Sequence, residues 1–173
     1  MVFNEQILYS FMDSDEHIQT HILSVWCKEK KFFKHGVEGM LFLTEKHLMF
    51  VTKTEAKMKW WVAAVERQIR NLLDSKNIMI HHDGYDDKEL RLDLQNEKNM
   101  EIPFNQILNV DSEEKSWGSV LNLEINMGNK TKKYEFSIVS GWVKYPAKDP
   151  IKFLKVDWMP FVDFIKNKQK VMD

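Results

Sequence analysis

The sequence has little of what marks disulfide-rich, zinc-binding or membrane-spanning proteins. Its 173 residues include one cysteine, Cys27, which excludes an internal disulfide and a zinc site built from several cysteines. The longest uncharged apolar stretch is 60–65, far short of the roughly 18 residues that cross a bilayer. The first residues carry Glu5 and no basic segment, unlike a secretory signal. We therefore expect a single cytoplasmic domain that spans 1–173.

A large excess of charge of either sign is also absent, but the charge is unevenly distributed. The formal net charge is −1, yet residues 129–170 hold ten lysines against four acidic residues, a net +6 that leaves −7 for the rest of the chain. Such an asymmetry orients a protein on an anionic surface or on another subunit. The sequence pI of about 6.6 lies far below the value above about 9 expected of a nucleic-acid-binding domain, so we expect no nucleic-acid partner.

Hydrophobic periodicity predicts six or seven antiparallel strands, a central helix and a C-terminal helix. The six glycines and four prolines form no repeats or low-complexity linkers. The clearest hairpin joins 40–44 to 47–53 through a two-residue connection at Glu45 and Lys46. The other predicted elements are a short helix at 3–11, strands at 21–31, 77–83, 89–94, within 100–110, 119–127 and 132–139, and helices at 54–75 and 157–171.

Residues 54–75 form the one long helical pattern in the interior of the sequence, with Thr54 as its cap. Trp60 lies off the apolar stripe of this helix. The simplest interpretation is that the stripe packs against the sheet. The alternative assigns Trp60 and Arg67 to a contact with a protein partner or with a second copy of the chain. The predicted stripe consists of Met58, Trp61, Val62, Val65, Ile69, Leu72 and Leu73.

The C-terminal helix is predicted to begin with Asp157 as its N-cap and Pro160 in its first turn. Phe161, Phe164 and Ile165 then share one face of the helix. Alternating strands leave one apolar face on a sheet, and this aromatic helix face is suited to cover it.

Two segments resemble the pleckstrin-homology-like and GRAM-like domain families, including the prokaryotic members. Residues 39–51, Gly-Met-Leu-Phe-Leu-Thr-Glu-Lys-His-Leu-Met-Phe-Val, are similar to a family signature of a glycine, an apolar strand, Thr-Asn-Lys-Arg-Leu and a second apolar strand. Residues 102–110, Ile-Pro-Phe-Asn-Gln-Ile-Leu-Asn-Val, resemble the stretch that follows in these families.

The resemblance covers 18–53 and 99–170. It implies a mainly β (α+β) fold, in which a bent antiparallel barrel of about seven strands is plugged by the C-terminal helix. Residues 54–98 depart from the family pattern, because a helix and a hairpin are inserted where the family has a short connection.

Residues that often carry catalysis or bind metals are present without the partners that they need. His17 and His21 have the spacing of two ligands on a helix, but no further ligand completes a site of recognised spacing. Cys27 lacks a signature that would make it a nucleophile, and the acidic turn 83–87 lacks the ligand spacing of a calcium loop. We expect no metal, no cofactor and no enzymatic activity.

A basic and aromatic segment at the first predicted hairpin is the best binding candidate. Lipid-binding members of the families that the chain resembles place basic residues there, which hold a phosphorylated headgroup, and in some members apolar tips that enter the bilayer. The competing interpretation places the two phenylalanines in or beside the core and the lysines in solvent. The lipid-binding hypothesis names Lys28, Lys30, Lys31, Phe32, Phe33 and Lys34, aided by Lys130, Lys132 and Lys133.

These features favour a non-enzymatic binding module that attaches peripherally to an anionic membrane surface. Three or four lysines at about 1 kcal/mol each and two phenylalanines at about 2 kcal/mol each give roughly 8 kcal/mol before association costs. One copy would then bind weakly, and stable attachment would need a second site or oligomerisation. The alternative is a protein-interaction or self-assembly module that uses the inserted helix.

Overall fold

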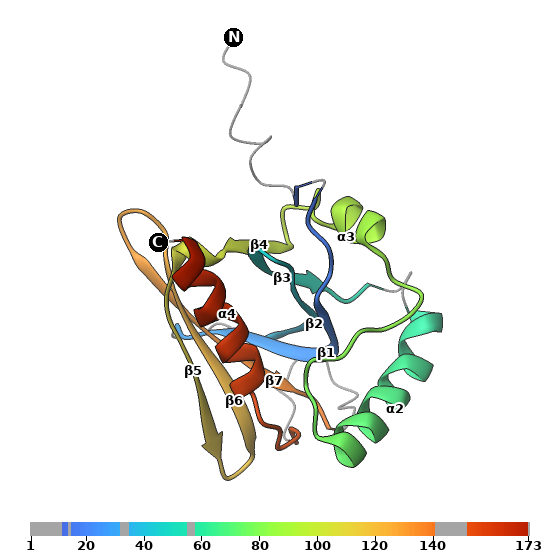
Figure 1. Cartoon of the computed structure of the whole chain (residues 1–173). Coiled ribbons are helices and arrows are strands. Elements are labelled where there is room, and N and C mark those ends of the chain that lie inside the picture. Colours follow the sequence, from blue (N-terminus) through green and yellow to red (C-terminus); the bar gives the residue numbers. More distant parts are fainter. Residues whose placement is uncertain (1–11, 14, 32–34, 55–57, 141–151, 173) are drawn as a thin grey trace.

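A computed structural model of the chain describes residues 12–13, 15–31, 35–54, 58–140 and 152–172, without the side chains of residues 58 and 59. The helix predicted at 3–11 lies outside these ranges. None of the described helices combines the length and the apolar character that crossing a bilayer requires. The elements, in chain order, are β1 (Thr20–Glu29), β2 (Val37–Leu43), β3 (His47–Thr52), α2 (Met58–Ser75), α3 (Asp87–Asp93), β4 (Met100–Pro103), the 3-10 helix η2 (Phe104–Gln106), β5 (Ile107–Lys115), β6 (Gly118–Asn126), β7 (Thr131–Ile138) and α4 (Met159–Met172) (Figure 1).

The seven strands form one antiparallel sheet in the order β4-β3-β2-β1-β7-β6-β5. β4 and β5 are its two edges, so the sheet is not closed. The C-terminal helix α4 contacts β5 and η2, while α2 and α3 lie on the other side of the molecule (Figure 1). The predicted mainly β architecture with seven antiparallel strands and a C-terminal helix is confirmed, but the sheet is open between β4 and β5 and does not close into a barrel.

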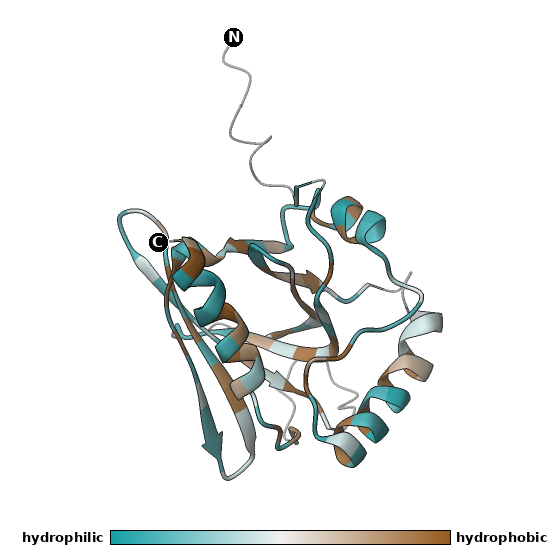
Figure 2. Ribbon diagram, viewed as in Figure 1, coloured by the Kyte–Doolittle hydropathy of each residue, from teal (hydrophilic) through white to brown (hydrophobic). Residues whose placement is uncertain are grey.

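β2 is buried on both faces. Leu41 and Leu43 belong to the core that α4 covers, whereas Met40 and Phe42 belong to a second core under α2 and α3. A strand covered on both sides has no polar face, and this explains why 40–43 is an unbroken apolar run. Figure 2 shows the apolar residues along the inner strands and hydrophilic residues at the outer turns.

The central strand β1 is interrupted at Leu23 and Ser24, where its register with β2 shifts and Ser24 adopts a φ of 55°. Gln68 of α2 bridges the interruption. Its Oε1 accepts a hydrogen bond from the Leu23 N–H at 2.7 Å, and its Nε2 donates one to the Leu23 carbonyl at 2.8 Å. Buried backbone groups need such partners, so this contact fixes α2 against the sheet.

The buried face of α2 differs from the predicted stripe. Val62 and Leu73 were predicted to be buried, but they are 55% and 66% exposed. The prediction was wrong because it counted only apolar residues, whereas the two hydrogen bonds to β1 turn the polar Gln68 inward. The residues that face the sheet are Trp61, Ala64, Gln68 and Leu72.

The strand predicted at 89–94 is wrong, because this segment lies largely within helix α3. Asp86 caps the helix, and its carboxylate accepts a hydrogen bond from the Glu89 N–H at 2.9 Å. Leu90 and Leu94, four residues apart, are buried, while Leu92 is exposed. Leucines at every second position satisfy a strand period and also contain a helical i, i+4 pair, and the cap decides between them.

The strand predicted at 77–83 is also wrong, so the inserted hairpin is absent from the described part of the chain. The segment runs beside β1 without forming a ladder. The Ile80 carbonyl accepts hydrogen bonds from the His21 N–H at 2.7 Å and from the Thr20 hydroxyl at 2.9 Å.

The hairpin β2–β3, the strands at 119–127 and 132–139, and the C-terminal helix are confirmed. Within 100–110 the predicted strand and bend correspond to β4 and η2, but β5 begins at Ile107 and continues to Lys115, beyond the predicted range. Asp157 caps α4 as predicted, because its carboxylate accepts a hydrogen bond from the Met159 N–H at 2.9 Å. Phe161 and Ile165 are fully buried beneath this helix.

Replacing Gln68 with methionine tests the contact between α2 and β1. Methionine has a similar length, but it leaves the Leu23 N–H and carbonyl without partners, so we expect the free energy of unfolding to fall by about 2–4 kcal/mol. Urea denaturation measures the change. Glu66→Gln, on the exposed side of the same helix, is the control, with an expected change within about 0.5 kcal/mol. Equal stability of Gln68→Met and the parent chain would contradict this role.

Candidate functional site

The predicted lipid-binding lysines gather where β1 ends and β7 begins. β1 and β7 are antiparallel neighbours, so Lys28 pairs with Glu135, and the Lys30 N–H donates a hydrogen bond to the Lys133 carbonyl at 2.8 Å. Residues a hundred positions apart in the sequence therefore become adjacent. We call this group the basic rim, and in Figure 1 it lies on the side away from α2 and α3. It comprises Lys28, Lys30, Lys31, Lys130, Lys132 and Lys133.

Part of the predicted segment lies outside the described residues, namely Phe32, Phe33 and Lys34. The structure therefore places the lysines on either side of these three residues but not the proposed apolar tips.

Two lysines of the basic rim are neutralised by neighbouring carboxylates. The Lys30 ammonium lies 3.1 Å from the half-buried Glu135 carboxylate, and the Lys31 ammonium lies 3.6 Å from that of Glu29. Within the described ranges no such ion pair is found for Lys132 or Lys133. Glu124 is nevertheless the cross-strand neighbour of Lys133, so the charge of Lys133 is partly compensated.

A recess of about 140 Å³ opens beside the rim on the outer face of β5, β6 and β7. Lys30 and Lys133 reach it, but so do the acidic residues Asp111 and Glu124. A phosphate placed there would meet carboxylates as well as ammonium groups. The recess is therefore unsuited to a phosphorylated headgroup, and the rim is suited to contact with an extended anionic surface. Its lining is completed by Asn109, Asn122, Leu123 and Tyr134.

A cluster of two acids and a histidine was missed by sequence reasoning, because its members are distant in the chain. The buried Glu16 carboxylate lies 2.8 Å from His47 Nδ1 and accepts a hydrogen bond from the Thr44 hydroxyl at 2.6 Å. On the other side of the imidazole, His47 Nε2 lies 3.6 Å from the Glu101 carboxylate. Glu101 is 9% exposed, and neither of its oxygens has a hydrogen-bond partner among the described residues.

The pKa values of the two acids of this cluster shift in opposite directions. Burial raises the pKa of Glu16, but the hydrogen bonds from His47 and Thr44 outweigh it, and the net pKa lies below the ordinary value. Burial raises the pKa of Glu101 to about 7, against the smaller opposing effect of His47. The cluster can hold a proton near neutral pH. In the part of the chain that the structure describes, no three acidic, histidine or cysteine side chains are placed to hold a metal ion.

The other candidates that the sequence singled out are separated. His17 is exposed, with Nδ1 2.8 Å from the Asp87 carboxylate, whereas His21 is buried with Nε2 3.2 Å from the Met40 sulfur. Burial holds the pKa of His21 well below its ordinary value, and it raises the pKa of the Cys27 thiol to about 12. A thiol with this pKa is not a nucleophile at neutral pH.

Trp60, predicted as a contact for a partner, is half-buried inside the inserted segment. Its indole N–H donates a hydrogen bond to the Asp83 carbonyl at 3.2 Å, and its ring centroid lies 5.9 Å from that of His21 and 6.1 Å from that of Tyr85. The backbone approaches the indole closely at Gly84, where φ is +93° and an added Cβ would lie 2.6 Å from the indole nitrogen. Trp60 therefore holds the segment after α2 against this helix. Arg67, the other residue predicted to contact a partner, is exposed on the same helix.

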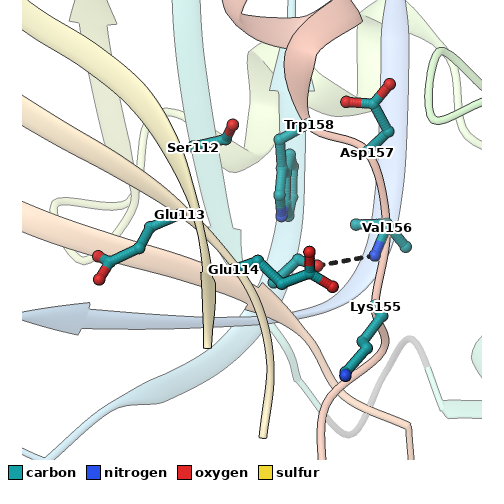
Figure 3. A pocket seen from close by; sticks show the side chains of 8 residues that line it. Ser112, Glu113, Glu114, Lys155, Val156, Asp157 and Trp158 are labelled. Atoms are coloured by element: carbon teal, nitrogen blue, oxygen red, sulfur yellow. Dashed lines mark hydrogen bonds between the residues drawn. The ribbon is translucent and has the colours of Figure 1, made fainter. Parts of the chain in front are cut away.

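A second recess, of about 360 Å³, lies beside the edge strand β5 and was not predicted. One side is formed by β5 and the start of β6, and the other by the segment that leads into α4 (Figure 3). We call it the β5 groove. Its lining residues are Ser112, Glu113, Glu114, Ser119, Lys155, Val156, Asp157 and Trp158.

No family model and no curated protein matches the chain. A solved structure described as the Vps36 N-terminal PH domain is similar, with 10% sequence identity, a TM-score of 0.47, and coverage of 93% of this chain and 84% of that chain. A likeness of this degree says nothing about a ligand or a partner.

Glu101 gives a pH-dependent prediction. Because the pKa is about 7 in the folded chain and about 4.5 in the unfolded one, the folded form retains a proton that the unfolded form loses between these pH values. The contribution of Glu101 to stability therefore falls as pH rises from about 4.5 to 7. Glu101→Gln cannot ionise, so we expect its stability relative to the parent to increase over this window, measured by urea denaturation. Glu114→Gln, an exposed control, should show no such trend, and a pH-independent difference for Glu101→Gln would refute the assignment.

Proposed function

We propose that this protein is a non-enzymatic binding module that attaches peripherally to anionic lipid surfaces through the basic rim. The observation that carries the proposal is the pairing of β1 with β7, which joins lysines from two distant segments at one end of the sheet. The net +6 of residues 129–170 favours the same orientation toward an anionic surface.

The size of the electrostatic free energy favours a weak and reversible contact with the membrane surface. The lysines Lys130, Lys132 and Lys133 contribute about 1 kcal/mol each near an anionic leaflet, or about 3 kcal/mol together. Lys30 and Lys31 contribute less, because nearby carboxylates already compensate their charge. This sum does not exceed the cost of association, so one copy binds weakly at best and salt should reduce the binding strongly.

Sedimentation with vesicles tests this function. We expect the protein to pellet with phosphatidylserine-containing vesicles at low salt, and to remain in solution with phosphatidylcholine vesicles or at high salt. Lys132→Glu combined with Lys133→Glu should lower partitioning at least about thirtyfold, since two lysines at about 1 kcal/mol each are lost and two repelled negative charges are added.

The matched control reverses two exposed lysines outside the basic rim, Lys88→Glu with Lys98→Glu, and leaves the rim intact. The control should pellet nearly as well as the parent chain. Equal losses for the two double variants would show that only net charge matters, and no pelleting of the parent chain would refute the proposal.

A second candidate function, self-association through α2, is favoured by the exposed apolar residues Val62 and Leu73. If two α2 helices pair antiparallel, Val62 lies opposite Leu73 of the second copy, and Glu66 comes within reach of Arg70. The same surface of each copy then forms the interface, as two-fold symmetry requires. Dimerisation would also strengthen a weak lipid contact, because two rims bind together.

Light scattering over a range of protein concentrations tests this function. We expect a mass that rises above that of one chain, and a return to one chain for Val62→Glu combined with Leu73→Glu. Glu66→Arg and Arg70→Glu should each weaken association, and the double exchange should restore it. A mass of one chain at every concentration would rule out self-association.

A further inference from the structure

A third recess, of about 410 Å³, lies between the segment that precedes β1 and the residues around the start of α3. We call it the acidic recess. Histidines at positions 17, 81 and 82 line it together with acidic side chains, and none of the described lysines or arginines does. It contains the acidic turn that the sequence singled out and that the basic rim leaves unexplained. The acidic lining residues are Asp83, Asp86, Asp87 and Glu89.

The walls of the acidic recess are held in place by hydrogen bonds. The Trp60 indole N–H donates to the Asp83 carbonyl at 3.2 Å, and Tyr85 in the same wall is only 3% exposed. The Asp87 carboxylate accepts a hydrogen bond from the Ile18 N–H at 2.8 Å, which joins α3 to the segment before β1. The recess is therefore already formed in the free chain.

Gln68 determines which nitrogen of the His82 imidazole carries the hydrogen. Gln68 Oε1 accepts from the Leu23 N–H and Gln68 Nε2 donates to the Leu23 carbonyl, so the orientation of the amide is fixed. His82 Nε2 lies 2.9 Å from Gln68 Oε1. An amide oxygen only accepts hydrogen bonds, so His82 Nε2 must donate. Burial, together with the charge of Arg67, lowers the pKa of His82 to about 4. At neutral pH the ring is therefore neutral, and its Nδ1 carries a lone pair.

His82 Nδ1 is consequently a buried acceptor that lacks a donor. His82 is 6% exposed, and no hydrogen bond among the described residues involves this nitrogen. The two ring nitrogens point away from each other, so the bond of Nε2 to the interior leaves Nδ1 directed toward the recess that His82 lines. Buried polar atoms are nearly always satisfied in native structures. This one points to a donor that is supplied from outside.

The carboxylates of the recess differ in how far they are already engaged. Asp86 accepts a hydrogen bond from the Glu89 N–H at 2.9 Å, and Asp87 lies 2.8 Å from His17 Nδ1. The Asp83 carboxylate makes no hydrogen bond or ion pair within the described part of the chain, and its charge acts on the adjacent His82. A ligand therefore meets two neighbouring acceptors, His82 Nδ1 and the Asp83 carboxylate.

The chemistry of these acceptors selects the ligand. Among the described residues no three acidic, histidine or cysteine side chains are placed to hold a metal ion. A guanidinium group matches the two oxygens of one carboxylate, whereas the acceptors here belong to two different side chains. A primary ammonium group has three N–H donors on one compact charge, so it can bind both at once. The negative charge of the lining favours a cation in the same place.

We propose that the acidic recess binds a primary ammonium group, which donates hydrogen bonds to His82 Nδ1 and to the Asp83 carboxylate. The group belongs to a free alkyl diamine or to a lysine side chain. This site is independent of the proposed membrane contact, because the basic rim lies on the side of the molecule away from α2 and α3 (Figure 1).

Nuclear magnetic resonance of the full chain, titrated with pentylammonium at constant ionic strength, tests the proposal. We expect saturable shifts of the amides of residues 81–87 and of the His82 Nδ1 resonance. Pentyltrimethylammonium has the same charge and alkyl chain but no N–H, so it should bind at least about tenfold more weakly. Absence of saturable shifts at these residues, or equal affinity for the two cations, would overturn the proposal.

The same titration identifies the source of the ammonium group. Tighter binding of 1,5-diaminopentane than of Nα-acetyl-lysine amide would support a free diamine as the ligand. The reverse order would support a lysine side chain of another protein. Binding of neither compound would contradict the proposal.

A pair of conservative variants separates the site from the overall charge of the chain. Asp83→Asn keeps the carbonyl that Trp60 contacts but removes the charge, so pentylammonium should bind about fivefold more weakly. Asp74→Asn removes an exposed carboxylate that lies about 21 Å from Trp60 along α2, and it should leave the affinity unchanged. Equal effects of the two variants would overturn the assignment of Asp83.

Discussion

The interruption of β1 at Leu23 and Ser24 sets the constraint on which the rest of the structure depends. β1 is the middle strand of the sheet and pairs with both β2 and β7. Its freed backbone groups are buried, so they require partners, and Gln68 supplies them from α2. The inserted segment is thus part of the core. Its return path beside β1, fastened through Ile80 and Trp60, follows from the same contact.

The antiparallel pairing of β1, β7 and β6 then distributes charge between two surfaces. The lysines of residues 130–133 meet those of 28–31 at one end of β6, while the acidic side chains of β5 lie near the other end. A chain whose formal net charge is only −1 therefore presents two surfaces of opposite sign.

Local sequence signals predicted the structure correctly where the contacts that decide it lie within a few neighbouring residues. Asp157 was predicted to accept a hydrogen bond at the start of the C-terminal helix, and it does so. The apolar run 40–43 was predicted to be a strand, and it is buried on both faces. Local signals failed where the apolar residues fitted the period of a strand and that of a helix equally well. Leu90, Leu92 and Leu94 alternate as in a strand, but the cap of Asp86 and the burial of two of the three leucines produce a helix.

The sequence by itself determined the strands of the sheet, the terminal helix and the uneven charge, because alternation, caps and composition act over a few neighbouring residues. Only the tertiary structure decided which face of α2 is buried, which lysines of the rim are paired, and that β5 has an open edge beside a groove. These features depend on contacts between distant segments, such as Gln68 with Leu23 and Lys30 with Glu135. A buried hydrogen bond or an ion pair needs both partners in place, and the chain brings them together only on folding.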